Sequence, residues 1–303
     1  MMKGIRQMKK VLLIINPMAG TRQWRRTIPE ILSILNKADY LPTVYLTRER
    51  GDGAAVSEKS AGDYDLVAVC GGDGTLNEVI SGLLRGGHRT PVGYLPAGST
   101  NDFASGIGIS ANLTEACQLL VREAPRELDI GRFGPDRYFS YTASFGLFTA
   151  VSYTTSQAAK NILGHAAYIL EGIRSLADVR PVHLKITADD GTYENDYLFG
   201  AVCNSTSLGG ILKLADHEVH MSDGLFESLL IPFPSDLLEL NRVLNALRNK
   251  NYSDSSLIFI RSSRFVIDAP EKLPWTLDGE EASASSPLEI VNLHHAVRLV
   301  CPA

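Results

Sequence analysis

The chain has 303 residues, of which 45% are hydrophobic and 21% charged, a composition typical of a folded globular protein. This length predicts two domains. The net charge of −5 argues against a nucleic-acid partner, because phosphate contacts usually need a basic face. The apolar run 11–15 is too short for a signal peptide, and no run approaches the ~20 residues of a membrane span. We therefore expect a cytoplasmic protein.

The cysteines are too far apart in the sequence to suggest a shared site. None of them forms the paired spacing of a zinc site or a disulfide framework. We expect free thiols at all four positions, which are Cys70, Cys117, Cys203 and Cys301.

The first half of the chain alternates between strand and helix patterns. The run Val11–Ile15 is continuously apolar and ends at Asn16-Pro17, as in a strand buried on both faces. After Gly74, apolar residues recur at helical spacing. Strands are expected at 11–15, 43–46, 66–69 and 91–95, and helices at 24–35, 53–60, after 74, and at 114–121. This alternation predicts an α/β domain with a mostly parallel sheet.

Beyond about residue 130 the pattern changes to alternating strands without regular helices. Such runs predict antiparallel strands over one core; they lie at 138–141, 183–186, 197–203 and 225–231, with helices at 156–176 and 234–247 and a last strand at 288–300. We expect an α/β domain over 9–131, with 288–303 packing back on it. A β-rich, β-sandwich-like domain is expected over 132–287.

The segment 69–79, VCGGDGTLNEV, carries three glycines between a predicted strand and a predicted helix. Glycines there let backbone N–H groups approach a ligand, and the helix dipole attracts phosphate. The loop lacks the lysine of a P-loop and the spacing of a dinucleotide fingerprint. A plain Gly-Asp-Gly turn, with Thr75 capping the helix, explains the same letters. Taken alone, this loop is explained equally well by a phosphate site and by a plain turn.

Two more loops follow predicted strands of the same sheet. They read NPMAG at 16–20 and PAGSTNDFA at 96–104. The carboxyl ends of parallel strands meet at one edge, where open α/β sheets bind ligands. Three such loops together favour a phosphate-bearing ligand.

In these motifs the sequence resembles the diacylglycerol kinase catalytic domain family, in its bacterial soluble branch, to which sphingosine and ceramide kinases are similar. GGDGT is shared with NAD kinases and phosphofructokinases, and its combination with NDFA and the late DGE at 278–280 is more specific. The resemblance implies an N-terminal domain like those of NAD kinase and phosphofructokinase, followed by a β-rich domain. It also implies that ATP binds in the cleft between these two domains.

The resemblance further implies which residues bind ATP. The implied contacts are Asn16, Pro17, Met18, Ala19, Gly20, Thr47, Gly71, Gly72, Asp73, Gly74, Thr75, Leu76, Asn77 and Ser99. A carboxylate among phosphates needs a cation, and phosphoryl transfer commonly uses Mg²⁺. Asp73 is therefore assigned to the catalytic Mg²⁺–ATP site.

Glu280 matches the general base of the family, which takes the proton of the attacking lipid hydroxyl. The neighbouring Glu281 competes for this role, and a solvated acidic turn is the alternative explanation of DGEEAS.

The segment 222–225, SDGL, matches a second metal position of the bacterial branch. The implied Mg²⁺ ligands are the carbonyls of His220 and Leu225 and the carboxylate of Asp223, with Asp102 and Asp129 joining through water. These are the oxygen ligands that Mg²⁺ prefers. A simple Ser-Asp-Gly turn explains the same letters.

Taken together, the sequence predicts a lipid kinase that transfers the γ-phosphate of ATP to a lipid hydroxyl, most plausibly that of diacylglycerol, giving phosphatidic acid. Another lipid acceptor (sphingoid or phosphatidylglycerol-like), an NAD kinase-like enzyme and a non-catalytic nucleotide-binding regulator remain alternatives. Contact with the inner face of the membrane is expected to be peripheral and transient, through the helix at 156–176 if its apolar stripe is not core. No nucleic acid is expected, and a homodimer is left open.

Overall fold

The computed structural model describes residues 8–20, 24–146, 180–204, 207–208, 212–213, 220–270 and 273–302. The helix predicted at 156–176 lies outside the described residues. The chain divides into two compact units, of which unit 1 comprises Met1–Leu128 and His295–Ala303 and unit 2 comprises Asp129–His294.

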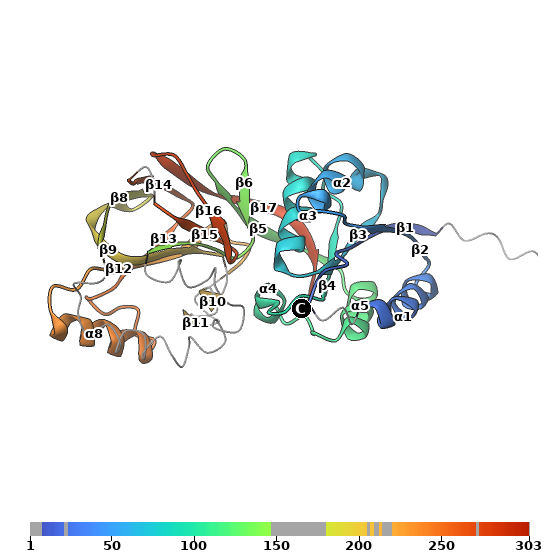
Figure 1. Ribbon diagram of the computed structural model, residues 1–303, viewed down its shortest axis with the longest axis horizontal. Coiled ribbons are helices and arrows are strands. Elements are labelled where there is room, and N and C mark those ends of the chain that lie inside the picture. The colour runs from blue at the N-terminus through green and yellow to red at the C-terminus, as the bar shows by residue number, and fades with distance from the viewer. Residues whose placement is uncertain are drawn as a thin grey trace, which may run out of the picture. The chain divides into compact units, whose positions relative to one another are not determined.

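Unit 1 alternates strands and helices, as the sequence predicts (Figure 1). Its elements are β1 (Lys9–Ile15), α1 (Trp24–Lys37), β2 (Tyr40–Leu46), α2 (Asp52–Ser60), the 3₁₀ turn η1 (Ala61–Asp63), β3 (Leu66–Gly71), α3 (Asp73–Arg85), β4 (Val92–Pro96), α4 (Asp102–Gly106) and α5 (Leu113–Arg122). Two strands continue into unit 2, namely β5 (Pro125–Phe133) and β17 (Leu288–Val300).

The strands of unit 1 form a parallel sheet in the order β17-β4-β3-β1-β2. Every residue of β3 and β4 is buried, which explains why these strands read as unbroken apolar runs. Helices α2 and α3 pack together on one side of the sheet, and α1 and α5 on the other (Figure 1). The carboxyl ends of β1, β3 and β4 therefore lie at one edge.

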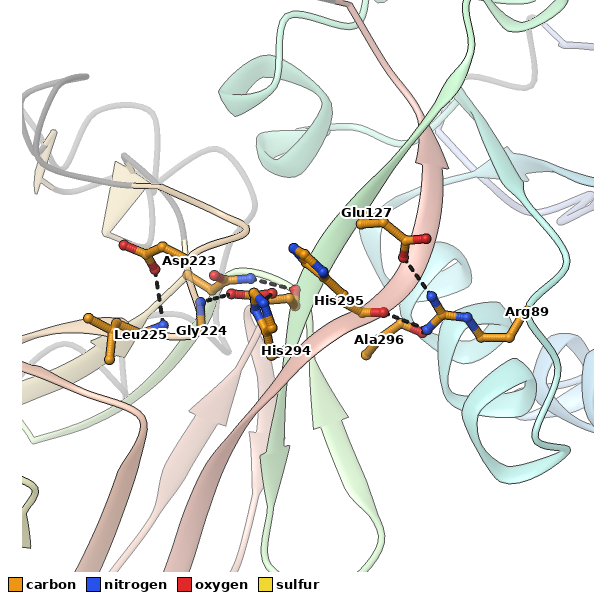
Figure 2. Close-up of polar contacts among 10 residues, drawn as sticks. Arg89, Glu127, Asp223, Gly224, Leu225, His294, His295 and Ala296 are labelled. Carbon is orange, nitrogen blue, oxygen red and sulfur yellow. Dashed lines mark hydrogen bonds and ion pairs between the residues drawn. The ribbon is translucent and has the colours of Figure 1, made fainter.

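The C-terminal part of β17 is fastened within unit 1 by Arg89. Its guanidinium donates to the carbonyl oxygens of His295 and Ala296, and it pairs with Glu127 at 2.7 Å (Figure 2). Leu299 and Val300 then pair in parallel with Val92 and Gly93 of β4.

Unit 2 is rich in antiparallel strands (Figure 1). Its further elements are β6 (Arg137–Phe139), β7 (Thr142–Gly146), β8 (Val182–Ala188), β9 (Gly191–Cys203), β10 (Ser207–Leu208), β11 (Leu212–Lys213), β12 (Phe226–Pro232), α8 (Leu237–Arg248), β13 (Ile258–Ser262), β14 (Arg264–Asp268), β15 (Trp275–Leu277) and β16 (Glu280–Ala282). The predicted architecture, an α/β domain followed by a β-rich domain, is confirmed.

Two clusters of buried side chains form the core of unit 2. The larger contains Phe133, Phe145 and Trp275, whose rings meet edge to face at centroid distances of 5.0 to 5.3 Å. The smaller lies between α8 and the strands β9 and β12. No helix within the described part of the chain is long and apolar enough to span a bilayer.

Two features of the loops of unit 1 go beyond the sequence pattern. Helix α3 begins at Asp73 with Gly72 as its N-cap, so Thr75 lies inside the helix and does not cap it. The segment after β4 contains the short helix α4, which the sequence pattern did not indicate.

Candidate functional site

The first residue after each of β1, β2 and β4 hydrogen-bonds to the end of the neighbouring strand. The Asn16 N–H donates to the Cys70 carbonyl at 2.9 Å, and the Ala97 N–H donates to the Gly71 carbonyl at 2.7 Å. On the other side of β1, the Thr47 N–H donates to the Ile15 carbonyl at 2.9 Å. The four loops therefore form one continuous rim at the carboxyl edge of the sheet.

Glycines allow these loops to pack backbone against backbone. A Cβ atom on Gly98 would lie 2.6 Å from the Cα of Gly72, and one on Gly20 would lie 2.3 Å from the Ala97 carbonyl oxygen. Gly20 also has a φ of +47°, which L side chains rarely adopt. The 16–20, 71–74 and 96–104 segments are thus in direct contact, as expected of one binding site.

The side chain of Asn16 organises the first loop. Its carbonyl oxygen Oδ1 accepts from the Met18 N–H at 2.9 Å, and its Nδ2 donates to the Thr75 hydroxyl at 3.0 Å. The first loop is in this way tied to the first turn of α3. A helix start carries the positive end of the helix dipole, which suits a phosphate.

Asp73 turns its carboxylate toward the loop after β4. One oxygen, Oδ2, accepts from the Asp102 N–H at 2.8 Å, and the other, Oδ1, accepts from the Tyr94 hydroxyl at 3.2 Å. Asp102 is the first residue of α4, whose N-cap Asn101 has a φ of 53°. Asp73 therefore joins the GGDG segment to the NDFA segment, two motifs that lie 29 residues apart.

Tyr94 is a site residue that the sequence analysis missed, because it lies inside an apolar strand. Burial, and then the negative charge of Asp73, raise the pKa of Tyr94 well above its ordinary value. The phenol therefore keeps its proton and acts as the donor to Asp73. The pairing of a buried phenol with a carboxylate could only be found from the fold.

Other predicted ATP contacts differ in their exposure. Thr47, Thr75, Leu76 and Ala19 are buried, so Ala19 and Leu76 can meet a ligand only through their backbone. Met18, Gly20 and Ser99 are exposed. Asn77 is half-buried, and its Oδ1 accepts from the Ser81 hydroxyl at 3.4 Å.

In unit 2, the DGE motif forms a tight hairpin between β15 and β16. Leu277 pairs with Glu280, and the two turn residues, Asp278 and Gly279, have φ values of 50° and 83°. Two positive φ angles in a two-residue loop define a type I′ turn, which Asp-Gly favours. The predicted turn is therefore present, with Glu280 and Glu281 exposed and Asp278 buried.

Asp278 anchors this hairpin with a buried carboxylate. Oδ2 accepts from the Ser140 N–H at 2.6 Å, and Oδ1 accepts from the N–H groups of Tyr141 and Thr142, each at 3.0 Å. The Asp278 N–H in turn donates to the Thr142 carbonyl at 2.9 Å. The position of the hairpin is thereby fixed against the strand β7.

Glu280 and Glu281 are both exposed and follow each other in β16. Successive side chains of a strand point to opposite faces. Glu280 shares the face of its partner Leu277, and Glu281 shares the face of Thr276. Only one of the two carboxylates can therefore serve any one ligand face of the hairpin.

Asp129 is fully buried, and its carboxylate holds the loop that precedes β12. Oδ2 accepts from the Gly224 N–H at 2.7 Å, and Oδ1 lies 3.0 Å from Nδ1 of His294. Asn204 donates from Nδ2 to the Asp129 carbonyl at 2.6 Å. Figure 2 shows Gly224 and His294 at this position. The carboxylate is in direct contact with the loop predicted to bind metal.

Asp223 in that loop forms an ion pair with Arg261. Oδ2 lies 2.6 Å from Nη2 of Arg261, and Oδ1 accepts from the Leu225 N–H at 3.0 Å (Figure 2). Arg261 also contacts Glu227, at 3.2 Å from Nε to Oε1. Glu227 is buried and leaves Oε2 without a hydrogen-bond partner; burial raises its pKa to about 7, although Arg261 acts in the opposite direction.

The carboxylate oxygens around Asp223 are ligands of the kind that Mg²⁺ prefers. Carboxylate oxygens of Asp223 and Asp129 are hard ligands, and each oxygen has two lone pairs. Arg261 uses one lone pair of Oδ2, so a metal at Asp223 would share this oxygen with a guanidinium. His220 is exposed, and its carbonyl stays a predicted ligand.

Two protein families match the chain in sequence, one after the other. Residues 10–133 match the diacylglycerol kinase catalytic domain. Residues 142–301 match the YegS C-terminal NAD kinase beta sandwich-like domain. The fold and the glycine-lined rim thus define a kinase of the diacylglycerol kinase class with a sandwich-like second domain.

Full-length relatives have the same name. A Diacylglycerol kinase from Bacillus subtilis is 32% identical over 97% of both chains, and one from Staphylococcus carnosus is 29% identical over 97% of this chain and 95% of its own. A solved structure of a candidate diacylglycerol kinase from Bacillus anthracis superposes with a TM-score of 0.81 at 26% identity and covers 98% of both chains. The chain belongs to the bacterial diacylglycerol kinase family, a family of lipid kinases.

Proposed function

We propose that this chain transfers the γ-phosphate of ATP to the free hydroxyl of diacylglycerol and so forms phosphatidic acid. The observation that carries the proposal is the rim of glycine-lined loops, in which the Asp73 carboxylate accepts the Asp102 N–H at 2.8 Å. This contact unites the motif shared with NAD kinases and phosphofructokinases with the NDFA motif, and this combination is more specific for the lipid kinases. Family membership supports the acceptor.

Unit 1 supplies the nucleotide site in this proposal. The Asn16–Gly20 and Gly71–Asn77 segments, with Thr47 and Ser99, contact ATP, and their backbone N–H groups receive the phosphate oxygens. Mg²⁺ bound with the nucleotide neutralises phosphate charge. Asp73 keeps the two phosphate-binding loops in register and provides negative charge next to the metal.

Unit 2 supplies the group that activates the acceptor. Glu280 takes the proton of the lipid hydroxyl as a general base, and proton transfer to a positioned carboxylate contributes about 10²–10⁴ in rate. Asp278 fixes the hairpin that carries Glu280 through three backbone N–H groups. The exposure of Glu280 is consistent with access by a substrate.

The loop of Asp223 would hold a second Mg²⁺ in this proposal, with the carbonyls of His220 and Leu225 as further ligands and with Asp129 contributing through water. Its place in the protein would be structural, because the ligands come from a loop that Asp129 already anchors to Gly224.

The substrate is a membrane lipid, so the protein acts from the cytoplasm in transient contact with the inner face of the membrane. A protein with a net charge of −5 is repelled by an anionic surface unless it presents a local cationic face.

The test is a transfer assay with radiolabelled γ-phosphate. Purified protein is given ATP and Mg²⁺ with diacylglycerol in mixed micelles, in parallel with sphingosine, phosphatidylglycerol and NAD. We expect label in phosphatidic acid, with none after EDTA and recovery on adding Mg²⁺ in excess. Labelling of NAD, or of another lipid in preference to diacylglycerol, would refute the proposed acceptor.

A further inference from the structure

Helix α8 covers one side of unit 2 and has one buried apolar face and one exposed face. Its inner face contributes Leu240, Val243 and Ala246 to the smaller core cluster. The helix is thus held in place by packing, and among the described residues its other face is exposed. Figure 1 shows the helix beside the strands of unit 2.

The outer face begins with two exposed leucines in the first turn. Leu237 is 61% exposed and Leu238 is 80% exposed. They are the two most exposed large hydrophobic residues of unit 2 among the described residues. Single exposed leucines are ordinary on protein surfaces, but two adjacent ones at a fixed helix end form a compact apolar tip.

The rest of the outer face is cationic or amide-bearing. Residues three or four apart share a helix face, so the leucines continue into four exposed residues, Asn241, Arg242, Asn245 and Arg248, with Lys250 exposed just after the helix. The face carries three cations on a protein whose net charge is −5.

The acidic residues of this region are engaged at the helix start. Asp236, the N-cap, accepts the Glu239 N–H at 2.8 Å. Glu239 is half-buried, and its Oε2 accepts from the N–H and the hydroxyl of Ser235 at 2.7 and 2.8 Å. Hydrogen bonds from Ser235 to Glu239 and from Ser256 to Asp254 lower the pKa of each carboxyl, and the charge of Arg242 acts in the same direction on both. The field of Arg242 is therefore partly balanced, whereas Arg248 and Lys250 lie at the other end of the helix.

We propose that the outer face of α8 docks on an anionic lipid bilayer, with Leu237 and Leu238 inserted below the headgroups and Arg242, Arg248 and Lys250 facing anionic headgroups. An apolar tip beside cations is the arrangement that interfacial helices use. The partner is a membrane surface because the charge of the face is opposite to that of anionic lipid. The inference rests on the proposed function, which requires a substrate that resides in a bilayer.

The first test measures binding to sucrose-loaded vesicles by sedimentation, without ATP or diacylglycerol. Vesicles of phosphatidylglycerol and phosphatidylethanolamine are compared with vesicles of phosphatidylcholine alone. We expect the full chain to bind the anionic vesicles and to dissociate as salt is raised. The double variant Leu237→Ser and Leu238→Ser should bind about tenfold less tightly or worse, because membrane affinity grows with the apolar surface inserted.

A matched control removes two leucines that are exposed to a similar degree elsewhere. Leu41 and Leu46 in β2 are 54% and 49% exposed, and their replacement by serine should leave vesicle binding unchanged. Equal loss in both double variants would mean that general surface hydrophobicity, and not α8, determines binding.

A second variant tests the charges. Arg242→Gln, Arg248→Gln and Lys250→Gln together should weaken binding by about fivefold for each charge and flatten its salt dependence. The control neutralises Lys37, Lys59 and Arg122, three exposed cations in the last turns of α1, α2 and α5. This control changes the net charge by the same amount and should keep the wild-type salt dependence.

Activity separates this inference from the proposed function. The leucine variant should lose activity on long-chain diacylglycerol in vesicles and keep wild-type activity on a short-chain, monomeric diacylglycerol. Unchanged vesicle binding by both α8 variants overturns the docking surface. Failure of the wild type to phosphorylate any diacylglycerol while it still binds anionic vesicles overturns the proposed function and not the docking surface.

Discussion

The carboxylate of Asp73 accepts a hydrogen bond from the backbone N–H of Asp102 at 2.8 Å. The first residue of α3 is in this way attached to the first residue of α4, so the starts of two helices are held at the same edge of one sheet. The Asp102 N–H is engaged by Asp73, and the positive end of the α3 dipole lies at the same edge. An acid can in this way organise loops that are predicted to bind phosphate.

Asp73→Asn should weaken this attachment, because the amide offers one acceptor where the carboxylate offers two. Hydrogen bonds to a charged group are worth about 1.5–3 kcal/mol each. We expect a loss of about 1–3 kcal/mol in the free energy of unfolding and weaker ATP binding, measured by urea titration and by calorimetry. Tyr94→Phe removes the other donor. The double variant should lose less free energy of unfolding than the sum of the two single losses, because both hydrogen bonds use the same carboxylate.

Gly98→Ala should disturb the rim by steric conflict alone. The added methyl group would lie 2.6 Å from the Cα of Gly72 and 2.7 Å from Oδ1 of Asn101, so the loops must separate. Overpacking of this kind costs about 1–3 kcal/mol. The matched control is Gly191→Ala, where no atom lies within 4 Å of the new methyl group. An equal loss of stability or ATP affinity in both variants would contradict the close contact of the loops.

Asp278→Ala should be strongly destabilising, because it leaves the N–H groups of Ser140, Tyr141 and Thr142 without their acceptor. Each unsatisfied buried group costs about 1–3 kcal/mol, and we expect a total loss above about 3 kcal/mol in thermal or urea unfolding. Asp278→Asn, which keeps one oxygen, should retain more stability and show a reduced kcat if the hairpin positions Glu280. Asp136→Ala, in an exposed turn, is the control and should change the free energy of unfolding by less than about 0.5 kcal/mol.

Glu280→Gln and Glu281→Gln should behave differently, because the two side chains point to opposite faces of β16. If Glu280 is the base, Glu280→Gln lowers phosphoryl transfer by about 10²–10⁴ and leaves nucleotide binding intact. Glu281→Gln then retains activity. Loss of transfer in Glu281→Gln with normal transfer in Glu280→Gln would assign the base to Glu281. Normal transfer in both variants would mean that neither carboxylate acts as the base.

Glu227 should make stability depend on pH. Burial raises the pKa of this carboxyl to about 7, above the ordinary value of 4.5, so the folded protein binds more protons than the unfolded chain between these values. Its contribution to stability is therefore complete below about pH 4.5 and is lost as the pH rises through about 7. Two neighbouring charged groups also act on this carboxyl: Arg261 lowers its pKa and Asp223 raises it. The measurement is the melting temperature of Glu227→Gln minus that of the wild type, taken in EDTA. This difference should increase from pH 5 to pH 8, and a constant difference would contradict the raised pKa of Glu227.

The sequence predicts the α/β half closely where strands are buried on both faces. Val11–Ile15 and Leu66–Val69 are unbroken apolar runs, and the observed strands extend them by only two residues. Helix α4 was missed because its five residues, DFASG, are too few to show a helical periodicity. Tyr94 was missed for the opposite reason, since any side chain inside an apolar run reads as core.

The contacts that organise the candidate site join residues far apart in the chain, and no local pattern records them. Asp278 and Ser140 are 138 residues apart, and Arg261 and Asp223 are 38 residues apart. The motifs identified Asp278 and Asp223 as residues of interest, but the partners of their carboxylates come from strand pairing. The roles of Glu280, Asp223 and the ATP contacts accordingly stay predictions that the variants above can test.

Strand β17 begins in unit 2 and ends in unit 1, where Leu299 and Val300 pair with β4 and Arg89 holds the carbonyls of His295 and Ala296. During synthesis, β4 leaves the ribosome long before residues 295–300, because all of unit 2 lies between them. The edge of β4 that will receive β17 must therefore wait unpaired, in the condition that makes strand edges prone to aggregation. The nucleotide-binding unit, although it comes first in the sequence, is completed only after unit 2 has been translated.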